Sequence, residues 1–261
     1  MRWYLRKAQH PYRNKIIGHY WRFLSKPAFW VKYDADLLIN LCLKDYIQSA
    51  IFFNGYYERT IVEWLSSELK PDDVFWDVGA NIGAITLIAA RHCASVVAFE
   101  PDPSTMAKLR RNVDVNRLKN VRLESTALSD CDGEVLLNLG PESNTGMNSI
   151  VASHPDRPCV PVKAVRADSI LASTTSLNAP SVMKVDVEGA EAKVFAGALN
   201  LLSSPRLRAI MFEAKKGAGG RPDDQSLCLS LEAMGFRMRE FGCSDEGAKD
   251  EVTNYLALRR G

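Results

Sequence analysis

The chain has 261 residues, 46% of them hydrophobic and 25% charged, and a formal net charge of +2. These values are typical of one large soluble domain, or of a domain with an extension, and they exclude a disordered chain. The apolar runs are too short to span a membrane, and no apolar stretch follows the basic N-terminus as it would in a signal peptide. The six scattered cysteines contain no C-x-x-C pair, so we expect reduced thiols, a cytoplasmic protein and no bound metal.

The charge is distributed unevenly along the chain. Residues 1–32 hold eight basic side chains and no acidic one, so residues 33–261 carry a formal charge of −6. This basic arm is also rich in aromatic residues, and Pro11 and Pro27 interrupt any helical period. Such a segment can make peripheral contact with the inner membrane surface, or it can touch nucleic acid. We favour a third interpretation, in which the arm packs its aromatic side chains on the domain and leaves its cations in water.

Residues 34–69 are expected to be partly helical, because apolar side chains recur at helical spacing from Ile61 to Leu69. Pro71-Asp72-Asp73 then predicts a turn. We therefore place a boundary near residue 70. Residues 1–70 form a basic, aromatic, partly helical N-terminal extension, and residues 71–261 form the main domain.

The main domain opens with the sequence VFWDVGANIG at residues 74–83. The apolar run Val74–Val78 predicts a strand, the following glycines a tight turn, and residues 84–90 a helix. The spacing G-x-x-x-G differs from the G-x-G-x-x-G of a dinucleotide site, and no G-K-[ST] of a P-loop follows. Asp77, two residues before Gly79, would repel a pyrophosphate but would suit an ammonium or sulfonium group.

A second acid strengthens this interpretation. Residues 95–99 predict a strand that ends at Glu100, which lies 21 residues after Gly79. An acid at this distance is placed to bind the ribose hydroxyls of an adenosine. S-adenosylmethionine combines an adenosine, an ammonium and a sulfonium, so it is the cofactor that we expect. The predicted cofactor-binding residues are Asp77, Gly79, Ala80, Asn81, Ile82, Gly83, Glu100 and Pro101.

The following segments continue the alternation of strands and helices. Asp102 can cap a helix that starts at Pro103 and ends near Asn116, and residues 121–124 predict the third strand. Residues 127–130 then predict a loop. Asp130, or the backbone beside it, could meet the adenine amino group, although an ordinary turn acid fits the sequence equally well.

The second half predicts further strands at residues 134–139, 160–165, 181–186 and 208–212, and a terminal hairpin from residues 236–241 and 252–258. Helices are expected at residues 166–172, 190–202 and 226–234. Residues 140–158 predict a long loop, a feature that is often functional. This order is typical of a parallel sheet covered by helices on both faces, with ligands bound at the carboxyl ends of the strands. Asp77, Glu100, Asp130, Asp186 and Glu213 all fall at predicted strand ends.

Several motifs resemble the FkbM family of S-adenosylmethionine-dependent methyltransferases. They are G-Y-Y-E at 55–58, D-V-G-A-N-I-G at 77–83, F-E-P at 99–101, A-L-S-D at 127–130, N-T-G-M-N-S-I at 144–150, K-V-D-V-E-G-A-E at 184–191 and, more loosely, F-E-A at 212–214. The resemblance implies the class I methyltransferase fold, an α/β Rossmann-like doubly wound sheet of seven strands, of which the last is antiparallel. It also implies methyl transfer, often to a hydroxyl of a sugar or a polyketide-like product. One departure is Arg166-Ala167-Asp168, where the family usually has a sequence closer to T-L-D.

A hydroxyl is a weak nucleophile, so its methylation benefits from a nearby base. Asp186 is our first choice for this base, and Glu213 is the second catalytic candidate. Glu58, Asn144, Ser149, Glu188 and Glu191 are expected to bind the acceptor, a small molecule or glycan such as a sugar, glycolipid or secondary metabolite. Lys184 is expected to pair with a neighbouring carboxylate, because an unpaired buried lysine would be costly.

Two alternatives remain open at this stage. One is a non-catalytic scaffold or binding protein on a methyltransferase fold, with the basic arm as its working surface. The other is a nucleic-acid methyltransferase that uses the arm to bind phosphates. The acidic main domain and the absence of an N-P-P-Y-like pattern argue against the second. The sequence does not give the oligomeric state.

Overall fold

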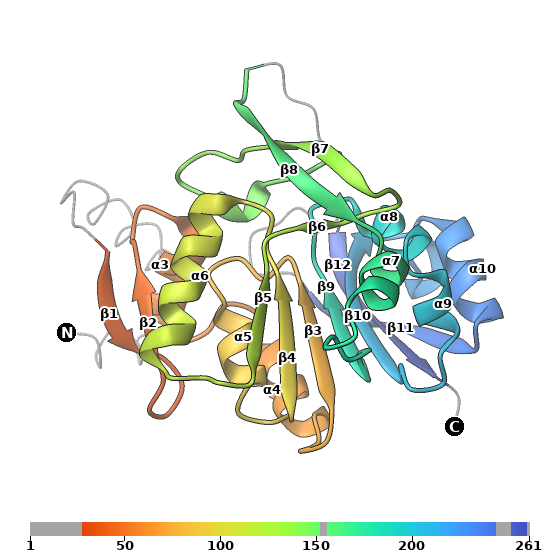
Figure 1. The fold of residues 1–261 in the computed structure, drawn as a ribbon, viewed down its shortest axis with the longest axis horizontal. Helices are drawn as coiled ribbons and strands as arrows, with labels where there is room; N and C mark the ends of the chain where they lie inside the picture. The colour runs from red at the N-terminus through yellow and green to blue at the C-terminus, as the bar shows by residue number, and fades with distance from the viewer. Residues whose placement is uncertain (1–27, 152–155, 244–251, 260–261) are drawn as a thin grey trace.

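The computed structural model describes residues 28–151, 156–243 and 252–259, so most of the basic arm lies outside the described residues. A seven-stranded sheet forms the centre, in the order β11-β12-β10-β9-β3-β4-β5 (Figure 1). Its strands are β3 (Val74–Val78), β4 (Ser95–Phe99), β5 (Val121–Glu124), β9 (Val182–Val185), β10 (Ala209–Lys215), β11 (Phe236–Cys243) and β12 (Val252–Arg259). Only β12 runs antiparallel to its two neighbours in this sheet. The expected doubly wound sheet with an antiparallel last strand is confirmed.

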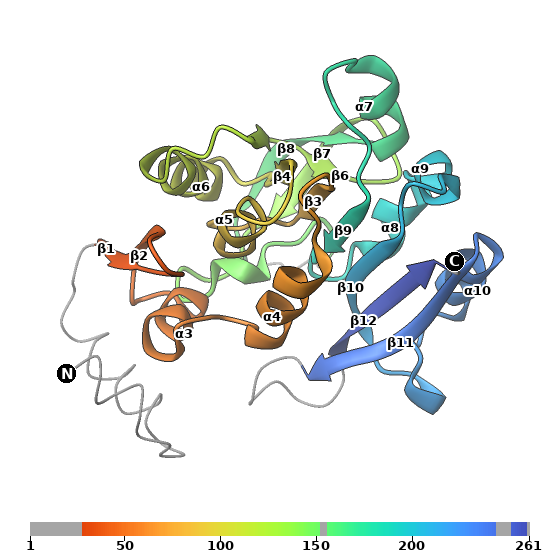
Figure 2. The same cartoon turned by 90° about the horizontal axis from the view of Figure 1, so that it is seen from below.

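Helices cover both faces of the sheet (Figure 2). One face carries α4 (Arg59–Glu68), α5 (Ala84–Ala89) and α6 (Pro103–Val115), and the other carries α7 (Ala167–Ser173), α8 (Glu191–Ala196), α9 (Leu199–Ser203) and α10 (Gln225–Ala233). All five residues of β3 are buried, and they alternate between the two faces. Phe75 belongs to the core cluster of α5 and α6, whereas Trp76 belongs to the cluster of α8 and α10. A central parallel strand is apolar throughout for this reason.

The segment before the main sheet contains a β-hairpin that the sequence did not predict. Its strands β1 (Phe29–Lys32) and β2 (Leu38–Leu41) pair antiparallel, and α3 (Tyr46–Asn54) follows. The hairpin packs against α6, where the side-chain oxygens of Asn116 and Asn112 accept bonds from the backbone N–H groups of Leu38 (2.8 Å) and Asn40 (2.9 Å). Residues 29–69 share a core cluster with the sheet. A division at residue 70 stays a prediction.

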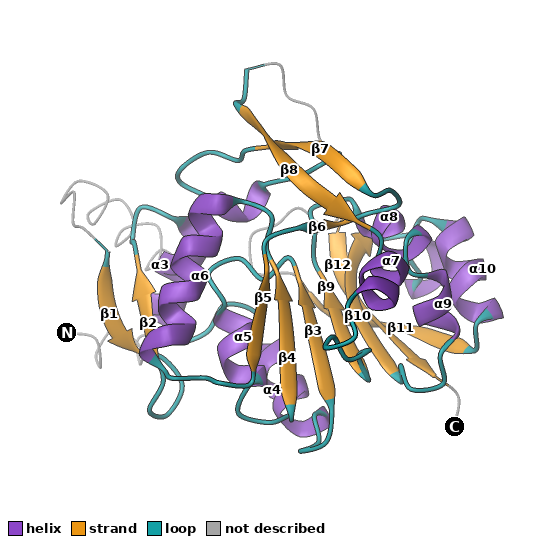
Figure 3. Cartoon of the chain, viewed as in Figure 1, coloured by secondary structure: helices purple, strands orange, loops and turns teal. Residues whose placement is uncertain are grey.

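A smaller three-stranded sheet lies over the carboxyl ends of the central strands (Figures 1 and 3). It consists of β6 (Ala127–Leu128), β8 (Cys159–Val165) and β7 (Gly133–Asn138), in that order. The sequence predicted a loop at residues 127–130, but Ala127 and Leu128 pair in parallel with β8. The connection from β7 to β8 contains a short 3₁₀ helix, η1 (Thr145–Met147).

The helix expected at residues 190–202 is broken into α8 and α9 at Gly197. A Cβ atom at Gly197 would lie only 1.9 Å from the carbonyl oxygen of Ser129. The break therefore accompanies a close backbone approach between α8 and the end of β6. Within the described part of the chain, no helix has the length and apolar character needed to cross a bilayer.

Candidate active site

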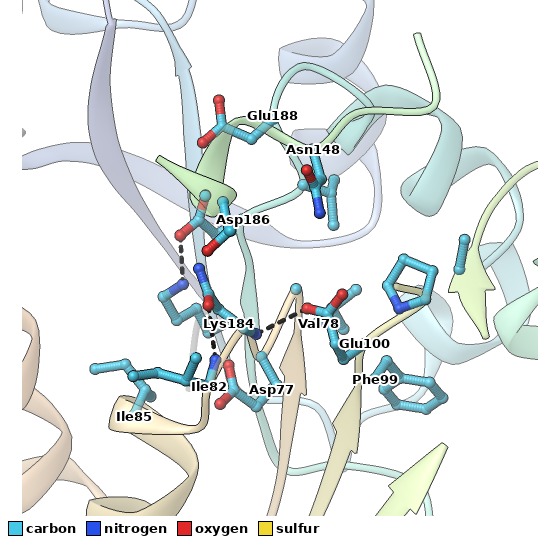
Figure 4. A pocket seen from close by; sticks show the side chains of 18 of the residues that line it. Asp77, Val78, Ile82, Ile85, Phe99, Glu100, Asn148, Lys184, Asp186 and Glu188 are labelled. Carbon is cyan, nitrogen blue, oxygen red and sulfur yellow. Dashed lines mark hydrogen bonds and ion pairs between the residues drawn. The ribbon is translucent and has the colours of Figure 1, made fainter. Parts of the chain in front are cut away.

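A pocket opens at the carboxyl ends of β3, β4, β9 and β10, below the loop that contains η1 (Figure 4). Its walls come from the turns after these strands, from the β7–β8 connection and from the segment before α4. Parallel α/β sheets bind their ligands at this edge.

The turn between β3 and α5 forms one wall. Its backbone is left-handed at Gly79 (φ 83°), Asn81 (φ 51°) and Gly83 (φ 90°). A Cβ atom at Gly79 would lie 1.8 Å from the carbonyl oxygen of Asp186, so no side chain fits there. Glycine thus allows the turn after β3 to touch the turn after β9, and it leaves the backbone open to a ligand.

Glu100 forms the next wall and is only 6% exposed. Its Oε2 accepts a bond from the N–H of Asn81 and its Oε1 accepts one from the N–H of Asp102, both at 2.9 Å. Burial raises the pKa of Glu100 to about 7, although these two N–H groups act in the opposite direction. Each carboxylate oxygen keeps a lone pair that can accept a hydrogen bond from a hydroxyl, as ribose binding requires.

Asp77 lies deeper, with 1% exposure. Thr86 donates to its Oδ2 at 2.5 Å, while Oδ1 has no hydrogen-bond partner among the described residues. Burial raises the pKa of Asp77, against the opposing charge of Lys184. An unpartnered buried oxygen beside a bare glycine turn, with Glu100 next to it, fits a ligand that brings hydroxyls and positive charge. The same set opposes a pyrophosphate.

The opposite end of the pocket is crowded with carboxylates. Asp186, Glu188 and Glu213 line it together with Glu58, which occupies the N-cap position of α4 in a left-handed conformation without a side-chain capping bond. Burial and the neighbouring carboxylates raise the pKa of Glu188 to about 8 and that of Glu213 to about 9. Among the described residues, no cluster of three or more His, Cys, Asp or Glu side chains is arranged to hold a metal ion.

One buried cation lies at this acidic end and pairs with a carboxylate there. Lys184 is 4% exposed, and its Nζ donates to Oδ2 of Asp186 at 2.7 Å. Burial disfavours its charge, but the carboxylates of Asp186, Glu58 and Asp77 outweigh burial and raise its pKa. Lys184 thus pairs with Asp186 as expected from the sequence.

Most of the predicted cofactor residues line the pocket. They are Asp77, Gly79, Ala80, Asn81, Ile82, Glu100 and Pro101. Gly83 lies directly behind them as the N-cap of α5. Asp130 does not line the pocket: it is on the surface, where Lys193 donates to it at 3.1 Å and lowers its pKa.

The predicted acceptor residues divide into two groups. Glu58 and Glu188 line the pocket, whereas Asn144, Ser149 and Glu191 do not. Asn144 caps η1 by accepting from Gly146 N, and Ser149 donates to the Glu188 carbonyl at 2.7 Å. Glu191 accepts from the N–H groups of Val187 and Gly189. These three side chains shape the loops instead of facing the cavity.

Sequence reasoning missed several lining residues: Ile47, Tyr57, Thr126 and Asn148. Asn148 belongs to the quoted motif at 144–150 and could have been considered there. Tyr57 likewise belongs to the quoted motif at 55–58, beside Glu58. Ile47 lies in no quoted motif, and no spacing links it to the glycine turn.

A buried carboxylate fastens the loop above the pocket to the N-terminal segment. Asp45 Oδ1 caps α3 by accepting from Gln48 N at 3.0 Å. Its Oδ2 accepts from both the N–H (2.9 Å) and the hydroxyl (2.8 Å) of Thr145, 100 residues away. Tyr46 N also donates to the carbonyl of Ser143 at 2.7 Å. The roof of the pocket is therefore held in place by residues that precede the main sheet.

The sheet order, the glycine turn after the first central strand and the acid after the second define a class I S-adenosylmethionine-dependent methyltransferase. Comparison with known proteins specifies the family, since residues 77–238 match the Methyltransferase FkbM domain. The chain therefore belongs to the FkbM methyltransferase family, and S-adenosylmethionine is its cofactor.

Two curated relatives have a similar sequence. Hexuronic acid methyltransferase AglP of Haloferax volcanii is 31% identical over 173 residues, which cover 66% of this chain and 68% of AglP. The 31-O-demethyl-FK506 methyltransferase FkbM of Streptomyces tacrolimicus is 30% identical, with 67% and 76% covered. The crystal structure of Methyltransferase FkbM from Methylobacillus flagellatus KT shares the fold, with a TM-score of 0.51 and 16% identity, and covers 81% of this chain and 52% of its own.

Proposed function

We propose that the chain transfers the methyl group of S-adenosylmethionine to a hydroxyl oxygen of a small molecule or glycan, such as a sugar, glycolipid or secondary metabolite. The observation that carries this proposal is the placement of Asp186. It follows β9 at the pocket edge, its side chain is 29% exposed, and Lys184 holds it at 2.7 Å. An oriented carboxylate open to the cavity is suited to accept the proton of an attacking hydroxyl.

The proposed cofactor end is the glycine turn with Glu100. The bare backbone at Gly79 would admit the ligand, and the two oxygens of Glu100 would accept its ribose hydroxyls. When bound, S-adenosylmethionine supplies an electrophilic methyl group on a sulfonium sulfur. The chain itself contributes orientation, and the surrounding carboxylates favour positive charge at this point.

The proposed acceptor end consists of Asp186 as general base, Glu213 as a second proton-holding group, and Glu58 and Glu188 as groups that hydrogen-bond the other hydroxyls of the acceptor molecule. Because the pKa of Glu213 is raised to about 9 and that of Glu188 to about 8, both groups carry a proton at neutral pH. Asp186 beside Lys184 is thus the carboxylate best suited to be the base.

The names of the relatives support a hydroxylated acceptor, since one is a hexuronic acid methyltransferase and another acts on 31-O-demethyl-FK506. Nucleic acid is a poor fit because acids outnumber cations in the pocket wall. A cytoplasmic location rests on the cysteine pattern alone. Peripheral membrane contact through residues 1–32 rests on the charge of that segment, and residues 1–27 lie outside the described part of the chain.

Calorimetric titration with S-adenosylmethionine and with NAD tests the cofactor end. We expect binding of the first only, and its loss in Glu100→Ala and Asp77→Ala.

A panel of glycosides tests the acceptor end, with tritium-labelled methyl groups on the cofactor. The panel holds neutral hexosides, amino-hexosides and hexuronates, with a short RNA duplex as the nucleic-acid arm. We expect label on a hydroxyl oxygen, and a strong loss of rate without loss of cofactor binding in Asp186→Asn. Label on the RNA alone, or no transfer to any acceptor, would overturn the proposal.

A further inference from the structure

The acceptor end of the pocket is lined mainly by carboxyl groups, and a carboxyl group donates a hydrogen bond only while it carries a proton. Glu58, Asp186, Glu188 and Glu213 present carboxyl oxygens there. Lys184 Nζ already donates to Asp186. A sugar hydroxyl both donates and accepts a hydrogen bond, so it needs a donor as well as a carboxyl oxygen, and Glu188 and Glu213 provide a donor only while they keep their protons. A buried hydroxyl oxygen that lacks a donor costs binding free energy.

Asn148 supplies a donor that does not depend on the protonation of a carboxyl group. Its Oδ1 accepts the N–H of Gly140 at 2.8 Å, which fixes the orientation of the amide: the oxygen is turned to the backbone of its own loop and the NH₂ group is turned away from it. Asn148 lines the pocket, and no acceptor within the described residues bonds its Nδ2. Figure 4 shows the side chain reaching into the pocket from the loop, on the side of Asp186 and Glu188.

The loop that carries Asn148 is fixed on three sides, so this NH₂ group has a defined position. Ser149 donates to the carbonyl of Glu188, and backbone bonds join Ser149 to Asn138 in both directions at 2.9 and 3.0 Å. Asp45 holds Thr145 from the other side. A donor held this way loses little conformational entropy when a ligand binds.

We infer that Asn148 is an acceptor-binding residue. Its amide donates a hydrogen bond to an oxygen of the molecule that is methylated, while carboxyl oxygens opposite accept hydrogen bonds from the hydroxyls of that molecule. The acceptor class that satisfies both sides is a polyhydroxylated one, with a second oxygen next to the hydroxyl that is methylated. This assignment rests on the proposed function, and it adds a residue to which neither the sequence motifs nor the relatives give a role.

The test is Asn148→Asp, assayed with tritium-labelled cofactor on the glycoside panel. Aspartate keeps the shape and the oxygen that accepts from Gly140, but it replaces the donor with another acceptor. We expect kcat/KM for the best glycoside to fall about tenfold to a hundredfold, through KM, because the acceptor oxygen loses its donor. The affinity for S-adenosylmethionine, measured by calorimetry, and the Tm should stay at wild-type values.

The same change at Asn144 separates this assignment from the one expected from the sequence. Asn144 serves as an N-cap, a position that aspartate fills equally well. A loss of acceptor affinity in Asn144→Asp but not in Asn148→Asp would overturn the assignment, as would weaker cofactor binding in Asn148→Asp with acceptor KM unchanged. No transfer by the wild type would overturn the proposed function and this assignment together, whereas transfer that is insensitive to Asn148→Asp would overturn this assignment alone.

Discussion

The carboxylate of Asp45 both caps a helix and holds a distant loop. A second helix cap in the chain offers a control for the substitution of Asp45. In Asp45→Ala, α3 loses its cap and Thr145 loses the acceptor of both its N–H and its hydroxyl. Asp224 caps α10 in the same way, by accepting from Leu227 N at 3.0 Å, and its side chain also accepts from the hydroxyl of Ser226, two residues further along the chain. Both helices have nine residues. Asp224→Ala therefore removes a cap without detaching a loop.

The expected magnitudes follow from the bonds that are lost. A lost N-cap costs about 1 kcal/mol of unfolding free energy. Each bond from Thr145 to the buried Asp45 carboxylate adds about 1–2 kcal/mol, because the donor is left without its charged partner. We therefore expect Asp45→Ala to cost about 3–5 kcal/mol and Asp224→Ala about 1 kcal/mol.

Urea denaturation measures both costs, and amide hydrogen exchange followed by mass spectrometry locates the loop. In Asp45→Ala, peptides that cover residues 143–149 should exchange faster than in the wild type, and in Asp224→Ala they should not. Equal stabilities of the two variants, with unchanged exchange in these peptides, would show that Asp45 does not hold the loop.

The other predictions concern the pocket itself. Gly79→Ala forces a residue with a side chain into a left-handed conformation, which costs about 1–2 kcal/mol of unfolding free energy. Its Cβ atom also overlaps the Asp186 carbonyl. Urea denaturation should therefore show a loss of unfolding free energy larger than this, and calorimetry should show no cofactor binding. Glu213 keeps its proton in the folded state up to about pH 9, while the unfolded chain releases it near 4.5, so it lowers stability progressively as the pH rises between these values. Glu213→Gln should therefore be more stable than the wild type at pH 8 and equal to it at pH 4, and a constant difference at all pH values would contradict this reasoning. Because the pKa of Glu100 is about 7, the affinity for S-adenosylmethionine should decline as the pH falls below 7. Glu100→Gln should bind about tenfold more weakly at pH 8 and show no such decline, as calorimetry at several pH values would test.

The central sheet was predictable because its strands carry short-range signals. Val74–Val78 is an apolar run ended by glycine, and such a run next to a helical period predicts a buried parallel strand. Glu100 was placed correctly beside the turn because the length of a strand-helix-strand unit is nearly fixed, so a count of residues locates the end of the next strand.

Features that depend on contacts between distant segments were not predictable. The hairpin at residues 29–41 depends on Asn112 and Asn116, more than 70 residues away. The break at Gly197 depends on the backbone of Ser129. Within the loop 144–150, the sequence marks both asparagines as polar, but only the folded loop shows that Asn148 lines the cavity while Asn144 caps η1. One-dimensional patterns do not contain these pairings.

The carboxylate of Glu100 bridges the turns after β3 and β4, and on the proposed assignment it binds the ribose. The ribose is the same before and after methyl transfer. A site that takes much of its affinity from this part of the molecule also binds the spent S-adenosylhomocysteine, and only the sulfonium charge distinguishes the two. The enzyme would then be subject to product inhibition, and its turnover in the cell would depend on how quickly the spent cofactor is degraded.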